Sequence, residues 1–73
     1  MYRIMLRSDQ RYYIDTNFFP AETEDHQFFI IMKSHILETN YDQFQDSDIK
    51  CIYILKKNVF VIILKESDDF NGI

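Results

Sequence analysis

Residues 51–65 read CIYILKKNVFVIILK, and this stretch has the strongest influence on the fold of the chain. A strand on the surface of a small protein alternates apolar and polar residues, because one face packs on the core and the other meets water. Here nearly every position is apolar, and only Lys56, Lys57 and Asn58 interrupt the run. The pattern predicts a hairpin of two strands, 50–56 and 59–65, around a Lys57-Asn58 turn. Both faces of this hairpin are apolar, so it needs a cover on each side.

One face of the predicted hairpin is a candidate interface. It carries Ile52, Ile54, Val59, Val61 and Ile63. Full burial of one such side chain contributes about 1.5–3 kcal/mol, which is a large part of the stability of about 5–15 kcal/mol that a folded domain has. Two interpretations stay open. Either the loops around residues 16–25 and 39–48 close over this face, or the face binds a second copy or another protein.

Residues 20–40 determine whether the chain contains a helix. Their FFIIM segment favours a strand by composition, yet the apolar residues also follow the spacing of a helical stripe. The stripe consists of Phe28, Ile31, Met32, His35 and Ile36. Acidic residues from Glu22 onward suit the start of a helix, and Asn40 suits a position just past its end. We therefore expect a helix over about 22–38.

The N-terminal residues predict another hairpin. Residues 2–7 and 11–15 alternate around Ser8-Asp9-Gln10, which is turn chemistry. This register places Ile4 beside Ile14. The expected order is ββαββ, an α+β fold in which one helix covers a four-stranded antiparallel sheet, with an all-β meander as the alternative. Residues 41–48 read as a polar loop, and 66–73 read as a flexible tail.

The length and composition limit the class of protein. The 73 residues suit one domain, and chains this short often need a partner or a covalent staple for stability. Cys51 is the only cysteine, which excludes an internal disulfide. The sequence has no secretory leader and no apolar run of the ~18 residues that a membrane span needs. We therefore expect a cytoplasmic protein without a membrane partner. The high content of Ile, Phe, Tyr, Asp and Lys is typical of an AT-rich genome.

The net charge of −4 is concentrated in the middle of the chain. Residues 16–48 hold seven acids against the single basic residue Lys33. The acids are Glu22, Glu24, Asp25, Glu38, Asp42, Asp46 and Asp48. An acidic surface favours basic protein partners, and it can occupy a basic channel as a phosphate backbone does. Ordinary solvated loops also carry acids, so this signal is weak.

Neither motif nor spacing indicates a catalytic centre. His26, His35 and Cys51 do not follow the spacing of metal ligands or of a nucleophile and its base. The acids at 42–48 do not fit an EF-hand calcium loop. The only glycine, Gly72, stands near the end of the sequence, which excludes a phosphate-cradling loop. We expect no enzymatic activity, no cofactor and no metal.

The leading functional hypothesis is a small acidic, non-enzymatic protein-binding module. In size and composition the chain resembles, by analogy only, the accessory inhibitors of phages and mobile elements. Such an inhibitor would block a basic, nucleic-acid-handling host protein through its acidic residues. The alternative is a homodimeric structural or assembly module that uses the apolar face. A minor alternative is a single-strand nucleic-acid binder that uses Arg3, Arg7 and Arg11 beside Tyr13, although the overall acidity counts against direct nucleic-acid binding.

Overall fold

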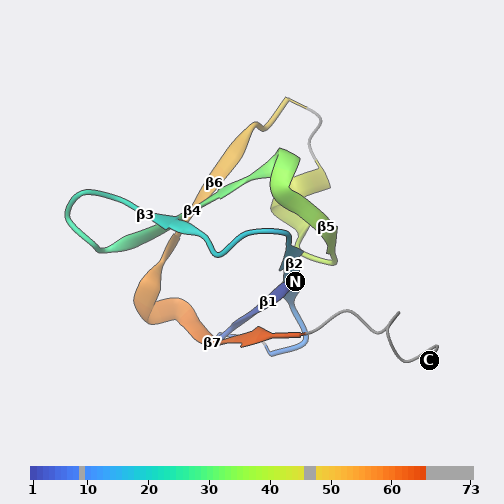
Figure 1. Ribbon diagram of the computed structural model, residues 1–73, viewed down its shortest axis with the longest axis horizontal. Helices are drawn as coiled ribbons and strands as arrows, with labels where there is room; N and C mark the ends of the chain where they lie inside the picture. Colours follow the sequence, from blue (N-terminus) through green and yellow to red (C-terminus); the bar gives the residue numbers. More distant parts are fainter. Residues whose placement is uncertain (9, 46–47, 66–73) are drawn as a thin grey trace.

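The computed structural model describes residues 1–8, 10–45 and 48–65. In these residues the chain forms strands joined by loops and short 3₁₀ turns (Figure 1). The strands are β1 (Tyr2–Leu6), β2 (Tyr13–Thr16), β3 (Ala21–Glu22), β4 (Phe28–Met32), β5 (Ile36–Thr39), β6 (Cys51–Leu55) and β7 (Val59–Leu64). The 3₁₀ turns are η1 (Lys33–His35), η2 (Asp42–Gln45) and η3 (Lys56–Asn58). Within the described ranges, no helix has the length and apolarity that crossing a bilayer requires.

The strands form two antiparallel sheets. Sheet A has the strand order β5-β2-β1-β7, and sheet B has the order β3-β4-β6. The chain passes from sheet B to sheet A at two similar corners, because η1 joins β4 to β5 and η3 joins β6 to β7 (Figure 1). At each corner the residue after the turn donates its backbone N–H to the carbonyl of the first lysine, Ile36 to Lys33 and Val59 to Lys56. These corners place β7 at an edge of sheet A.

The expected helix over 22–38, and with it the α+β fold, is wrong. Residues 28–32 form β4, which lies between β3 and β6 in sheet B. Phe29 and Ile31 are buried, whereas Phe28, Ile30 and Met32 are half-buried or exposed, and this is the period of two of a strand. Aromatic and β-branched side chains favour extended backbone. Two neighbouring strands also satisfy the backbone groups that a helix would pair internally.

The expected hairpin of residues 50–65 is also wrong. β6 pairs with β4, and β7 pairs with β1, so the two strands belong to different sheets. A two-residue hairpin turn of type I′ needs positive φ at both central residues, and His26 alone has positive φ among the non-glycine residues described. Lys56, Lys57 and Asn58 instead form the 3₁₀ corner η3.

The N-terminal hairpin is confirmed with its register. Ile4 lies opposite Ile14, and Met5 lies opposite Tyr13. The Leu6 N–H donates to the Tyr12 carbonyl at 3.4 Å, which continues the pairing toward the turn. Asp9 of that turn lies outside the described residues, as do Asp46 and the expected tail 66–73.

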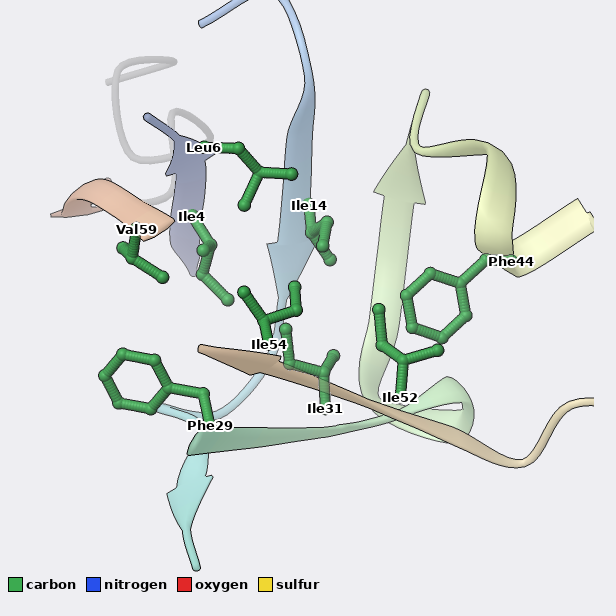
Figure 2. Close-up of a cluster of buried hydrophobic side chains, with 9 residues drawn as sticks. All are labelled: Ile4, Leu6, Ile14, Phe29, Ile31, Phe44, Ile52, Ile54 and Val59. Atoms are coloured by element: carbon green, nitrogen blue, oxygen red, sulfur yellow. The ribbon is translucent and has the colours of Figure 1, made fainter. Parts of the chain in front are cut away.

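The core lies between the two sheets, as Figure 2 shows. Sheet A contributes Ile4, Leu6, Ile14 and Val59, and sheet B contributes Phe29, Ile31, Ile52 and Ile54. Phe44 of η2 adds an aromatic ring beside Ile52 (Figure 2), so the segment expected as a polar loop supplies a core residue. Each sheet therefore covers the apolar face of the other, and no helix is needed for this purpose.

Candidate functional site

The outer edge of β7 offers backbone groups that β1 does not use. The Lys65 N–H donates to the Met1 carbonyl at 2.7 Å, and the Met1 amino group donates to the Lys65 carbonyl at 2.8 Å. Pairs that exchange bonds in this way alternate with pairs that do not along an antiparallel ladder. By this alternation Ile63 bonds to β1, as Lys65 does. The N–H and C=O groups of Ile62 and Leu64 point to the opposite side, where no strand of the described residues pairs with β7.

The side chains of β7 are apolar from its first residue to its last. Phe60, Ile63 and Leu64 are exposed by 47%, 40% and 62%. The ladder with β1 is irregular next to Phe60, because Leu6 pairs with Val59 and Met5 pairs with Val61, which leaves Phe60 as the extra residue. The part of the strand after this bulge is regular. It therefore combines open hydrogen-bonding groups with exposed apolar side chains.

The other edge strands expose fewer apolar side chains. Natural proteins blunt exposed edges with short strands, charged residues, prolines or bulges. β5, the other edge of sheet A, has four residues and carries Glu38. β3 has only two residues. β6 is uncharged, but Tyr53 is its one exposed side chain. Among the described edges, β7 is the longest strand and exposes the most apolar side chains.

The apolar face expected from the sequence is divided by the corner η3. Ile52, Ile54 and Val59 are buried in the core between the two sheets. Their side chains are therefore not accessible to another protein. Val61 is half-buried on the outer face of sheet A, opposite Met5. Ile63 alone of the five is exposed. Phe60 and Leu64 were missed by sequence reasoning. The sequence signal for them is the absence of charged residues from 59 to 64. This signal does not distinguish a strand buried inside a sheet from a strand at an open edge.

The acidic residues lie at separate places in the fold. Three of them belong to the β3–β4 hairpin, Glu38 lies on β5, and Asp42 and Asp48 lie at and after η2; Figure 1 shows the hairpin loop and β5 on opposite sides of the molecule. Asp46 is outside the described residues. The fold therefore does not gather the described acids into one surface.

Two acids of the hairpin are already engaged within the fold. Lys56 Nζ lies 2.9 Å from Glu22 Oε1, and His26 Nδ1 lies 3.0 Å from the same oxygen. These contacts, that of Lys56 first, lower the pKa of Glu22. Asp25 accepts hydrogen bonds from the Thr23 hydroxyl at 2.6 Å and from the Gln27 N–H at 3.0 Å, and these bonds lower the pKa of Asp25.

Arg3 and Arg7 of the minor hypothesis already have partners within the fold. Arg3 holds the buried Asp15 in a two-pronged ion pair, with Nε at 2.8 Å from Oδ1 and Nη2 at 2.9 Å from Oδ2. This pairing raises the pKa of Arg3. Its guanidinium also lies 4.5 Å from the centre of the Tyr13 ring. Arg7 donates from Nε to the Lys57 carbonyl at 3.1 Å. Arg11 lies on the exposed side of the connection to β2.

His35 and Cys51 are further side chains that the sequence offered for catalysis or metal binding. The His35 ring packs against the Phe18 ring with 4.8 Å between the ring centres, and Cys51 is half-buried on β6. Across residues 1–8, 10–45 and 48–65, no group of three His, Cys, Asp or Glu residues could hold a metal ion. The chain matches no family model, no curated protein and no solved structure. The candidate site is therefore defined by the geometry of the β7 edge.

Proposed function

We propose that this protein is a non-enzymatic protein-binding module that accepts a strand of another polypeptide at the β7 edge of sheet A. The observation that carries the proposal is the position of β7, an uncharged edge strand whose Ile62 and Leu64 direct their backbone groups outward. Strand addition draws its affinity from such main-chain groups, and alternate side chains supply specificity.

The chemistry of the added strand follows from β7. Ile63 and Val61 project on the outer face of sheet A, and Ile62 and Leu64 project on the face toward sheet B. Apolar side chains placed beside them would remove more of this exposed apolar surface from water, which is favourable. The favoured partner is therefore an extended segment with apolar residues on both faces.

Leu64→Pro tests whether partners bind to the β7 edge, and it leaves the hydrogen bonds between β7 and β1 intact. Proline removes the backbone N–H, and it is tolerated on an edge strand where that N–H faces solvent. Leu64→Ala is the matched control, because it shortens the same side chain and retains the N–H. Peptides selected from a display library on the wild-type protein would be titrated against all three proteins by fluorescence polarisation. We expect affinity for Leu64→Pro to fall at least about tenfold below that for Leu64→Ala.

Two results would contradict the proposal. Selected peptides that bind Leu64→Pro as tightly as Leu64→Ala would show that they bind elsewhere. Loss of binding after Glu24→Lys with Asp42→Lys would indicate instead the acidic contact expected from the sequence, since both residues are exposed and neither lies on β7 or on its neighbour β1. Circular dichroism of each variant checks that the fold is retained.

A further inference from the structure

We infer that the strand bound by β7 is β7 of a second copy, arranged antiparallel about a two-fold axis that passes beside Ile63. This inference rests on the proposed function, because it names the occupant of the same edge. A two-fold contact uses the same surface on both copies. The two sheets A would then continue into one another through their β7 strands.

The direction of the backbone groups restricts how two β7 strands can pair. In the regular part of β7 only Ile62 and Leu64 offer groups to the outer side, so each must lie opposite an outward residue of the second copy. Antiparallel pairing of Ile62 with Leu64 of the second copy meets this condition, and symmetry repeats it for the other pair. A shift by one residue would place Ile62 or Leu64 opposite a residue of the second copy, such as Ile63, whose N–H and C=O groups are already bonded to its own β1. That register is therefore excluded.

The position of the bulge selects among the remaining registers. A two-fold axis beside Val61 or Ile62 would place the irregular residue Phe60 opposite Ile62 or Leu64 of the second copy, where the bulge interrupts regular pairing. An axis beside Leu64 would set Ile62 opposite residue 66, beyond the described residues. An axis beside Ile63 keeps the bulge outside the contact. This register pairs residues 61–65 of both copies and centres on Ile63, which together with Leu64 provides the exposed apolar surface of this segment.

The side chains in this register are compatible on both faces. Ile63 meets Ile63 of the second copy on the outer face, and Ile62 meets Leu64 on the other face. Lys65 lies opposite Val61, so its aliphatic stem covers an apolar neighbour while its ammonium group reaches water. No two like charges lie directly opposite each other. A second copy therefore satisfies both edges at once with apolar contacts, which is why we favour it over a different polypeptide.

Sedimentation over a range of concentrations tests whether the dimer exists. We expect the wild-type protein and Leu64→Ala to show a concentration-dependent dimer, and Leu64→Pro to stay monomeric over the same range. A wild-type protein that is monomeric up to about millimolar concentration would overturn the inference. So would a Leu64→Pro protein that dimerises as the wild type does.

Cysteine cross-linking tests the position of the axis. In a Cys51→Ser background, Ile63→Cys places two thiols opposite each other at a pair of close Cα atoms, a geometry that suits a disulfide. Oxidation should link this variant to itself at least about tenfold faster than Phe60→Cys or Tyr53→Cys, which lie outside the contact. Faster linkage through position 60 or 53 would overturn the register. A monomeric chain that still binds peptides in a Leu64→Pro-sensitive manner would overturn the dimer and leave the proposed function standing.

Discussion

At the scale of single residues, Asp15 shows how the outer face of sheet A accommodates charge. Asp15 lies opposite Glu38 on β5 and opposite Arg3 on β1. Two carboxylates directly opposite each other are unfavourable, but Arg3 binds Asp15 with both prongs of its guanidinium. The Tyr13 hydroxyl donates to Glu38 Oε2 at 2.8 Å, and this bond raises the pKa of Tyr13. The polar row is thus satisfied internally.

Removal of Arg3 is therefore costly. Arg3→Met leaves the Asp15 carboxylate, which is 3% exposed, without its cation. Breaking a buried pair costs about 3–5 kcal/mol, and partial exposure of Arg3 reduces this to about 2–4 kcal/mol. Urea unfolding measures the difference. The double variant Arg3→Met with Asp15→Leu should recover most of the loss, because no charge is then buried. A loss below about 0.5 kcal/mol in the single variant would contradict this role.

The hairpin acids predict how stability responds to low pH. Glu22 and Asp25 have lower pKa values in the folded chain than their ordinary values. A carboxyl with a lowered folded pKa stabilises the fold above its ordinary pKa, and this contribution is lost as the pH falls through the folded pKa. We therefore expect the free energy of unfolding to decrease as the pH falls below about 4.5.

Lys56→Gln tests how much Glu22 contributes to this loss of stability at low pH. Lys56 is the first cause of the lowered Glu22 pKa, so its removal should make the decrease between pH 5 and pH 2.5 shallower. The contacts of Asp25 are unchanged in this variant. Urea unfolding at each pH, at low and high salt, measures the slope, and salt should weaken it because both acids are exposed. An unchanged slope in Lys56→Gln would show that its contact with Glu22 does not contribute.

At the scale of elements, the corner η3 distinguishes this fold from a hairpin of the same residues. In a two-residue turn of type I′, glycine in place of Asn58 would stabilise, because the position needs positive φ. In the observed corner Asn58 has no positive φ, and glycine only adds freedom to the unfolded chain. Asn58→Gly should therefore destabilise by about 0.5–1 kcal/mol. Thermal unfolding gives the sign of the change. An increase in stability would favour the hairpin over the corner, and Asn58→Ala separates the loss of the amide from the effect of glycine.

The elements differ in how far local sequence determines them. The alternation of residues 2–6 and 13–16 has one apolar and one polar face, which fixes both the hairpin and its register. The stretch around Phe28–Met32 satisfies helical spacing and strand composition alike, and only the presence of β3 and β6 on either side decides for the strand. Likewise, the polar residues Lys56–Asn58 are equally compatible with a hairpin turn within one sheet and with a corner between two sheets. The edge position of β7 depends on the strand order, a non-local property that the pattern does not contain.

At the scale of the whole molecule, two small sheets must enclose a core with few residues. The strands of sheet A and sheet B bury isoleucines against each other, and Phe44 lies at one side of this cluster, beside Ile52 (Figure 2). Tyr41 and Ile49 pack against the core in the same region as Phe44, between β5 and β6 in the sequence. The described residues of this connection, 40–45 and 48–50, therefore contribute to the core as well as linking the sheets.

Substitution of Phe44 should accordingly lower the free energy of unfolding strongly, although the segment around it is polar in sequence. Phe44→Ala removes a ring that is 7% exposed and leaves a cavity between β5 and β6, which should cost about 3–4 kcal/mol. Phe18→Ala is the matched control, because the same deletion at a ring that is 58% exposed should cost less than about 1 kcal/mol. Urea unfolding of the two variants gives the comparison. Phe44→Ala should therefore unfold at a clearly lower urea concentration than Phe18→Ala, and equal costs for the two variants would show that Phe44 does not close the core.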